Sequence, residues 1–178
     1  DVTDQDALHA LAQAVTAAPY VAVLAPDGLD ALTLCDGRAC YALAWAQLGD
    51  DYNAFLRLLF SDRVHKAGHN IKDLMRALLA EGLPTDGFMF DTALAAYLLD
   101  ATAGSYDLPR LAQAYLGGEA PDVQTAWALQ PVLREKMDAL GMLPLYTDIE
   151  LPLCPVLARM EHTGFLVDRK ALYDFGES

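Results

Sequence analysis

A short apolar run, Tyr20 to Ala25, constrains the fold of this chain more than any other feature of its sequence. Pro19 ends the helical pattern that precedes the run, and the valine content of the run is typical of a β-strand buried on both faces. Such a strand needs packing partners above and below it. The sequence therefore predicts a sheet that is flanked by helices.

Most of the remaining chain has the period of an amphipathic helix. Apolar residues recur at helical spacing in the segments 4–17, 50–60, 71–81, 93–99, 108–116, 123–140 and 146–161. Short strands are expected at residues 64–68 and 88–90. Asp91 is placed to cap the helix that follows it, and Gly164 is placed to end the last helix. This alternation after a hairpin predicts an α/β fold with a mixed central sheet.

The dipeptide Asp36-Gly37 lies between two apolar runs and predicts a β-hairpin. With these two residues as the turn, Cys35 and Cys40 on either side do not face one another directly. The spacing of the three cysteines fits no disulfide framework, so their thiols are expected to be reduced. We interpret Cys35 and Cys40 as small hydrophobic residues of the two strands.

The composition excludes several classes of protein. Hydrophobic residues make up 54% of the 178 residues and charged residues 21%, which is typical of a globular chain. No apolar run reaches the roughly 18 residues of a membrane-spanning helix, and the acidic N-terminus is unlike a signal peptide. Lys and Arg number 12 against 25 Asp and Glu, and the formal charge of −13 opposes binding to a phosphate backbone. We expect an intracellular chain that does not contact a membrane and binds DNA weakly or not at all by itself.

Aromatic residues give no separate signal for function. Trp45, Tyr97 and Trp127 stand in apolar contexts, and packing in the core is the default for large aromatic side chains. All three are therefore expected in the core.

Two sets of motifs carry a family resemblance. The first is Lys66-Ala67-Gly68-His69-Asn70-Ile71-Lys72, followed by Phe90-Asp91-Thr92, Tyr97-Leu98-Leu99 and Leu108-x-x-Leu111-Ala112. The second is Glu150-Leu151-Pro152-Leu153-x-Pro155-Val156-Leu157-x-x-Met160-Glu161-x-x-Gly164, followed by Val167-Asp168. The first set resembles the 3′–5′ exonuclease domain in the large, Klenow-type fragment of bacterial DNA polymerase I, a family-A polymerase. The second resembles the segment that leads from this domain into the polymerase thumb.

The resemblance implies a ribonuclease-H-like 3′–5′ exonuclease fold over residues 1–145. It implies that residues 146–178 form a linking helix and the truncated start of the thumb domain. The parent protein would be a DNA-directed DNA polymerase that acts in DNA replication and repair in the bacterial cytoplasm and associates with the nucleoid through its DNA. Nucleotidyl transfer and the Mg²⁺ that it requires would belong to the polymerase domain in cis.

Active members of this family bind two metal ions through an Asp-x-Glu on the first strand, an Asp in the helix after Lys-x-Gly-x-Asn, and a later Tyr-x-x-x-Asp. Two divalent ions about 4 Å apart need carboxylate ligands. Leu24 and Pro26 fall where the Asp-x-Glu is expected, and gapless counting places Leu74 at the Asp of the helix. Anchoring on Leu133-x-x-Lys136-Met137 places Ala126 at the last Asp and Asp122 near the position of the Tyr. None of the four side chains can ligate a metal. The sequence therefore predicts a degenerate site with no metal and no cofactor in this domain.

Three other carboxylates leave an alternative open. Asp27 and Asp30 follow the first strand, and Asp73 precedes Leu74, so shifted ligands would give a working metal-dependent exonuclease. However, one helical residue is a rotation of about 100°, and acids beside Gly28 are ordinary turn residues. We favour an inactive domain that serves as a structural platform for the polymerase domain.

The densest basic cluster contains Arg63, Lys66, Lys72 and Arg76. Together with Asn70, the last three lie near the place where single-stranded DNA enters an active relative, so these four are candidate DNA-binding residues. The alternative is a solvated helix face with ordinary ion pairs. We favour this alternative, because the net charge opposes DNA binding and no aromatic residues are interleaved with the cations.

Overall fold

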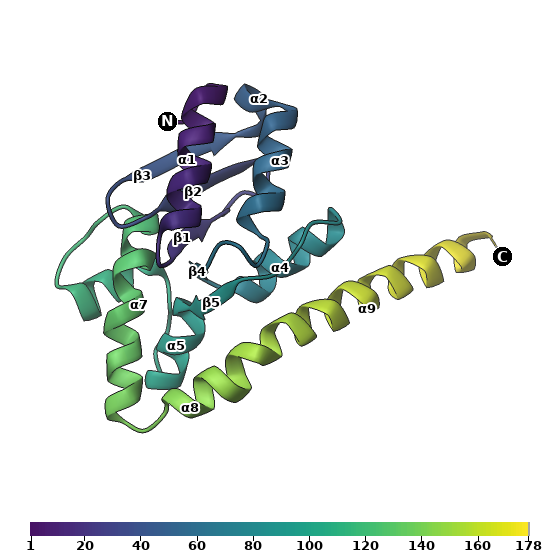
Figure 1. Ribbon diagram of the computed structural model, residues 1–178. Coiled ribbons are helices and arrows are strands. Elements are labelled where there is room, and N and C mark those ends of the chain that lie inside the picture. Colours follow the sequence, from purple (N-terminus) through teal and green to yellow (C-terminus); the bar gives the residue numbers. More distant parts are fainter. Residues whose placement is uncertain (178) are drawn as a thin grey trace.

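The computed structural model describes residues 1–177, with side-chain placement for residues 1–164. Its centre is a five-stranded sheet with the order β3-β2-β1-β4-β5 (Figure 1). The strands are β1 (Val21–Leu24), β2 (Ala31–Cys35), β3 (Cys40–Ala44), β4 (Lys66–Gly68) and β5 (Phe88–Asp91). The β1–β2 and β2–β3 pairs are antiparallel, and the β1–β4 and β4–β5 pairs are parallel. The mixed sheet expected from the sequence is confirmed.

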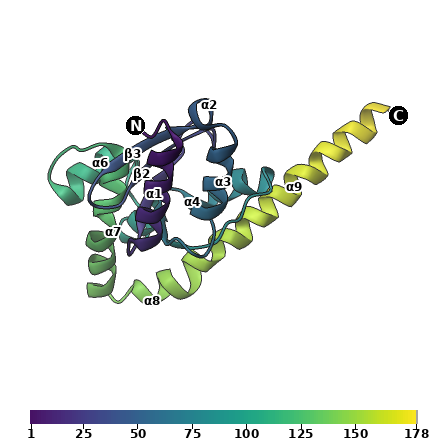
Figure 2. The same cartoon turned by 45° about the horizontal axis from the view of Figure 1, so that its top comes forward.

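Helices cover both faces of this sheet. They are α1 (Gln5–Ala17), α2 (Trp45–Leu48), α3 (Asp50–Leu59), α4 (Ile71–Ala80), α5 (Thr92–Leu99), α6 (Leu108–Leu111), α7 (Asp122–Ala139), α8 (Leu143–Leu145) and α9 (Leu151–Glu177), with π-helical turns η1 (Ala112–Leu116) and η2 (Tyr146–Glu150). The helices α1 and α3 lie side by side over β1 to β3, whereas α7 contacts β1, β2 and β4 (Figures 1 and 2). The helix α9 packs along α4 and then extends away from the sheet.

The strand β1 is buried on both faces, as its apolar run predicts. Val21 and Val23 pack into one core with α1, β2 and α3, while Ala22 packs into a second core with α5 and α7. Side chains of a strand alternate between its two faces, so β1 separates the two cores. Helices on both sides of the sheet follow from this arrangement.

One carboxylate joins the ends of three elements. Asp91, the last residue of β5, accepts hydrogen bonds from the backbone N–H groups of Asn70 (2.9 Å) and Ile71 (3.2 Å), where α4 begins. It also accepts one from the N–H of Ala93 (3.1 Å) and so caps α5, as predicted. Burial raises the pKa of the Asp91 carboxyl, while the backbone amides that face it act in the opposite direction.

The backbone of Asp91 is held by the C-terminal helical segment. The Asp91 N–H donates to the hydroxyl of Tyr146 at 2.6 Å, and this hydroxyl lies 3.1 Å from the Asp91 carbonyl, to which it donates. Tyr146 is fully buried, and its ring lies 5.1 Å from that of Phe90. The segment that begins with η2 is therefore anchored to the end of β5.

Lys66 is buried, although the sequence groups it with surface cations. Its Nζ donates to the carbonyl oxygens of Val64 (2.6 Å) and Ser61 (3.0 Å) and lies 5.3 Å from the ring centroid of Phe88. Burial lowers the pKa of Lys66 to about 7. Lys66 has no exposed surface, so both the candidate DNA contact and the favoured solvated helix face are wrong for this residue.

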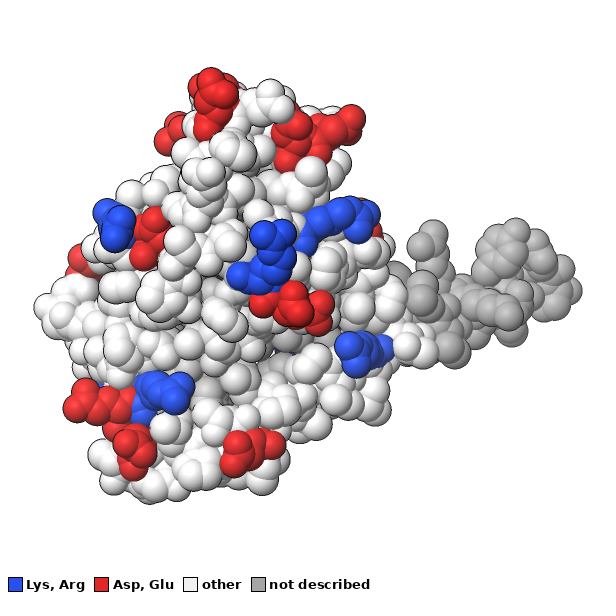
Figure 3. Space-filling model, viewed as in Figure 1, with Lys and Arg blue, Asp and Glu red and all other residues white. Residues whose placement is uncertain are grey.

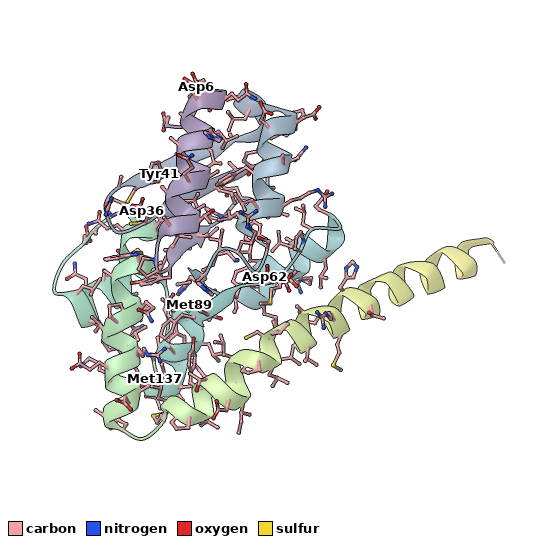
Figure 4. The ribbon with its side chains drawn as sticks, in the orientation of Figure 1. Asp6, Asp36, Tyr41, Asp62, Met89 and Met137 are labelled. Atoms are coloured by element: carbon pink, nitrogen blue, oxygen red, sulfur yellow. The ribbon has the colours of Figure 1, made fainter. Side chains whose placement is uncertain are left out.

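The hairpin turn lies one residue later than the sequence predicts. Cys35 pairs directly with Cys40, and the connection between them spans residues 36–39. The Asp36 carboxylate accepts hydrogen bonds from the N–H groups of Arg38 (2.8 Å) and Ala39 (2.9 Å), and Tyr41 donates to its other oxygen (Figure 4). The side chain of Asp36 thus supports the turn. Within residues 36–39, only Gly37 has a positive φ, of 91°.

Two of the three aromatic residues expected in the core are on the surface. Trp45 is 50% exposed and Tyr97 is 49% exposed, whereas Trp127 stacks on Tyr20 with ring centroids 5.5 Å apart. Trp45 is the first residue of α2, a four-residue helix with no buried residue. Tyr97 lies within α5, on the side of the helix that is exposed. Trp127 also packs closely against Gly37, where an added Cβ would lie 2.3 Å from the indole ring.

The chain is helical from Leu143 to Glu177 through α8, η2 and α9. The prediction that Gly164 ends the last helix is wrong, since α9 continues through it. A glycine is tolerated inside a helix at about 1 kcal/mol, and Gly164 does not take the positive φ of a helix end. The predicted domain boundary after residue 145 falls within this helical segment and stays a prediction.

Among the residues that the structure describes, no single helix has both the length and the hydropathy of a membrane span. The length and hydropathy of a span are reached only by α7 and residues 143–164 taken together, and the two segments are bent by 119° relative to each other.

Replacing Asp91 should destabilise the domain strongly. The Asp91→Asn variant keeps the shape of the side chain, but its NH₂ group would face backbone N–H groups that are also donors. We therefore expect a loss of about 2–4 kcal/mol in the free energy of unfolding. Urea titration followed by circular dichroism measures this loss. The exposed Asp27 makes no recorded side-chain hydrogen bond, and Asp27→Asn should change stability by less than about 0.5 kcal/mol. Equal effects of the two substitutions would contradict the role of Asp91.

Lys66 should make stability depend on pH. The unfolded chain keeps the Lys66 proton up to its ordinary pKa of 10.5, whereas the folded chain releases it at about 7. Between these two pKa values the unfolded state binds more protons than the folded state, so the free energy of unfolding rises as the pH rises from 7. The same stabilisation is lost as the pH falls back towards 7. We expect the free energy of unfolding of the native chain to gain about 1–3 kcal/mol on that of Lys66→Met between about pH 7 and 9.5. A difference that is constant over this range, measured by urea titration, would contradict a lowered pKa.

Candidate functional site

The parallel strands of the sheet end at one edge, and a large cleft lies outside that edge. β1, β4 and β5 run parallel, so residues after Leu24, Gly68 and Asp91 lie at their carboxyl ends, where open α/β sheets bind ligands. The cleft has a volume of about 1200 Å³. Its walls come from the loop after β1, the starts of α4 and α5, the loops before α6 and α7, and the first turns of α9.

Three of the four positions that the sequence predicts to be degenerate ligand positions line this cleft. Leu24 and Leu74 are half-buried in its walls, and Pro26 is exposed at its margin. Ala126 lies in α7 and is completely buried, so it has no surface in the cleft. Leu94, Val123, Leu153 and Leu157 also line the cleft. The walls therefore present mainly hydrocarbon where the sequence comparison places metal ligands.

The three alternative carboxylates do not come together. Asp73 lines the cleft, is exposed, and lies 3.4 Å from the guanidinium of Arg76. Asp27 lines a separate, smaller hollow with Asp1, and Asp30 lines neither. Among residues 1–164, no group of three or more His, Cys, Asp or Glu side chains is placed to hold a metal ion. These donors do not fit the two-metal site of an exonuclease.

Asp91 is a further carboxylate at the cleft, but only 4% of its surface is exposed. Its carboxylate accepts hydrogen bonds from the backbone N–H groups at the starts of α4 and α5. A carboxylate whose lone pairs are taken by helix N-termini stabilises those helices and is not free to bind a cation. Its position at the end of β5 is therefore explained by folding.

The candidate DNA-binding cations are paired with acids. Lys72 Nζ lies 2.8 Å from the Glu161 carboxylate, and Arg76 lies 3.0 Å from the other oxygen of Glu161. The hydrogen bond to Glu161 raises the pKa of Lys72, and the same contact lowers the pKa of Glu161. These pairs join α4 to α9. On the face of the domain seen in Figure 3, cations and acids are interspersed, and acids alone are seen at the end where α1 begins.

The backbone conformation at residue 70 favours an asparagine. It takes a φ of 62°, the only positive φ of a residue other than Gly in the part of the chain that is described. Asparagine tolerates this left-handed conformation better than most residues do, and here it directs the Asn70 N–H to Asp91. Its side chain is exposed on the cleft. Contact of Asn70 with DNA stays a prediction.

Sequence reasoning missed a polar wall of the cleft. His69 lies within hydrogen-bond distance of Thr92, with 2.8 Å between Nδ1 and the hydroxyl oxygen, and burial lowers its pKa. Tyr106 packs edge-on against Tyr97 with ring centroids 5.8 Å apart, and Asp107 is adjacent. Only His69 carried a usable signal, because it directly follows a strand that ends at the ligand-binding edge of a parallel sheet.

Comparison with known proteins identifies this fold. Residues 31–125 match the family model described as DNA polymerase I, ribonuclease H-like domain. DNA polymerase I of Pseudomonas aeruginosa is 32% identical over 77% of this chain and 20% of its own length. The chain thus spans about a fifth of that relative.

Solved structures give the same result. The POL domain of Pol1 from M. smegmatis, in complex with DNA primer-template and dNTP, superposes with a TM-score of 0.77 at 27% identity over 90% of this chain and 31% of that one. Escherichia coli RNase D, an exoribonuclease, has a TM-score of 0.67 at 20% identity over 88% of this chain and 49% of that one, which shows a shared fold. The chain belongs to the ribonuclease H-like domain family of DNA polymerase I.

Proposed function

We propose that this is the exonuclease-like domain of a DNA polymerase I in which the two-metal 3′–5′ proofreading site has been lost, and that it serves as a structural platform for the polymerase domain. One observation carries the proposal. Leu24, Pro26 and Leu74 line the cleft at ligand positions, and Ala126 fills the fourth inside α7.

The chemistry of proofreading supports the loss. Hydrolysis of a phosphodiester by two metal ions needs negatively charged oxygen ligands that hold both ions at the scissile phosphate. The hydrocarbon side chains at these positions supply none. Asp73, which directly precedes the ligand position at Leu74, is exposed and engaged with Arg76.

The alternative of an active exonuclease with shifted carboxylates finds less support. It requires Asp27, Asp30 and Asp73 to share ions, and these residues line different surfaces. No other set of donors among the described side chains replaces them. The alternative nevertheless defines the outcome that would overturn the proposal.

DNA contact and nucleotide addition are assigned to the rest of the polypeptide. The net charge of −13 and the pairing of Lys72 and Arg76 with Glu161 support weak or absent DNA binding by this domain. The related M. smegmatis POL domain was solved with primer-template and dNTP, which supports a polymerase domain in cis. We assign the Mg²⁺ of nucleotidyl transfer to that domain. By family membership we place the parent protein in the bacterial cytoplasm, at the nucleoid, in replication and repair.

The platform role concerns the C-terminal helical segment. We assign residues 1–145 to the exonuclease-like domain and residues 146–178 to the linking helix and the start of the thumb. Tyr146 anchors this segment to β5, and Glu161 joins it to Lys72 and Arg76 of α4. A helix held at both places gives the following domain a fixed starting direction.

Nuclease activity is the direct test. We expect the full-length gene product to release no nucleotide above the buffer background from 3′-labelled single-stranded DNA, with Mg²⁺ or with Mn²⁺, while it extends a primer. The Asp73→Asn variant is the matched control and should give the same result. Metal-dependent release that Asp73→Asn abolishes would overturn the proposed loss and establish the shifted site.

Metal binding should be absent and should be restorable. We expect no Mn²⁺ uptake above the background of surface carboxylates, measured by electron paramagnetic resonance. The variant Leu24→Asp, Pro26→Glu, Leu74→Asp places three carboxylates on one cleft and should bind Mn²⁺ in about the micromolar to millimolar range. Uptake by the unchanged protein that survives in an Asp73→Asn variant would point to ligands outside the cleft positions considered.

A further inference from the structure

Two cysteines face one another across the hairpin. Cys35 ends β2, Cys40 begins β3, and the two are direct partners in the antiparallel register. The residues that follow them, Asp36 and Tyr41, mark this end of the hairpin in Figure 4. The sequence predicts that the two cysteines are offset, and the shifted turn brings them into register. Both are free thiols in this structure.

The type of strand pair sets how close the two cysteines lie. The N–H of Asp36 donates to the carbonyl oxygen of Ala39 at 3.3 Å, so residues 36 and 39 form a hydrogen-bonded pair. The two types of pair alternate along an antiparallel ladder, so Cys35 and Cys40 form a non-hydrogen-bonded pair. The Cα atoms of such a pair are about 4.5 Å apart, inside the range of about 4.4–6.8 Å that a disulfide spans. The backbone therefore has the spacing that a disulfide needs.

The two thiols differ in exposure, which gives them different chemical roles. Cys35 is 3% exposed and packs in the second core with Ala22, whereas Cys40 is exposed on β3 at the edge of the sheet. Burial raises the pKa of the Cys35 thiol to about 11, and the neighbouring Cys40 thiol acts in the same direction. Cys35 is therefore a poor first nucleophile, and an oxidant in the solvent meets Cys40 first.

The turn between the cysteines leaves room for a bond between them. Residues 37–40 are exposed, and the two strands are already in register at this point. A bond between the two sulfur atoms therefore needs no new backbone contact and no repacking of the core. An accessible thiol beside a second, resolving thiol is the arrangement of redox-responsive cysteines, whose disulfides are transient in a reducing compartment.

We propose that Cys35 and Cys40 form a redox site, at which hydrogen peroxide converts the two thiols into a reversible disulfide. The Cys40 thiolate attacks one peroxide oxygen, the O–O bond breaks, and Cys40 becomes a sulfenic acid while one water leaves. The Cys35 sulfur then attacks the Cys40 sulfur, the S–O bond breaks, and the Cys35 proton leaves with the hydroxyl group as a second water. Two thiols thus lose two electrons to one peroxide, and a dithiol reductant restores them by exchange.

Peptide mapping of the full-length gene product tests the proposal. Trypsin cleaves after Arg38, so Cys35 and Cys40 leave in separate peptides unless a disulfide joins them. The native protein is treated with hydrogen peroxide, its remaining thiols are blocked with N-ethylmaleimide in urea, and the digest is analysed by mass spectrometry. We expect the peptide that ends at Arg38 to be joined to peptide 39–57 at least about tenfold more often than without peroxide. Dithiothreitol should separate the two peptides.

Two variants distinguish a pair from the oxidation of a single thiol. In Cys35→Ala the sulfenic acid on Cys40 has no resolving partner, so dimedone should label Cys40 at least about tenfold more than in the native protein. Cys154→Ala is the matched control. Cys154 is also buried, at 7% exposure, but it lies in α9, so its replacement should leave the yield of joined peptides unchanged.

The other outcomes overturn the proposal. Thiols that both still react with N-ethylmaleimide after peroxide treatment, or a sulfinic acid on Cys40 beside an unchanged Cys35 thiol, would show that the two cysteines do not act together. Peptide 39–57 joined to a second copy of itself would show an exposed thiol that links two molecules. None of these results bears on the proposed function, which the nuclease and metal-binding measurements test separately.

Discussion

The domain depends on the carboxylate of Asp91. Two helices, α4 and α5, begin within hydrogen-bond distance of this one side chain, and the N-terminal N–H groups of a helix must find acceptors when they are buried. A single acceptor shared between two helix starts sets their positions relative to each other and to the end of β5. Tyr146 adds the C-terminal segment to the same point. The walls of the cleft are thereby placed without any contribution from a metal ion.

This arrangement separates folding from catalysis. The residues that position the cleft are Asp91, Asn70, Thr92 and Tyr146, whereas the ligand positions are Leu24, Pro26, Leu74 and Ala126. Clustered carboxylates repel one another unless cations are present, so a cleft without metal is relieved of repulsion when acids are replaced by apolar residues. A catalytic site built in this way can lose its ligands while the fold remains intact, which is what the proposed function requires.

Local patterns in the sequence predicted much of the fold, and the errors have identifiable causes. The burial of β1, the mixed sheet and the capping by Asp91 follow from apolar runs and from the chemistry of helix ends, which are local. Lys66 was misplaced because only the tertiary structure supplies the carbonyl groups of Ser61 and Val64 that accept hydrogen bonds from its ammonium group. The hairpin shifted because the side chain of Asp36 forms hydrogen bonds that a dipeptide rule omits. Of the candidate site, alignment with the family motifs located three positions on the cleft, but the polar wall around His69 depends on loops that carry no periodic signal.

Because Trp127 packs against Gly37, the fluorescence of this tryptophan reports on the packing of the hairpin turn. The chain has two tryptophans, and they differ sharply in environment. Trp127 is stacked on Tyr20 between α7 and the hairpin, with an indole N–H that lacks a hydrogen-bond partner among the described residues, whereas half of the surface of Trp45 faces solvent. Fluorescence from Trp127 should therefore lie at shorter wavelength than that from Trp45. The difference spectrum between the native chain and a Trp45→Phe variant would thus separate loosening at the hairpin turn from loosening at the other end of β3, where α2 begins.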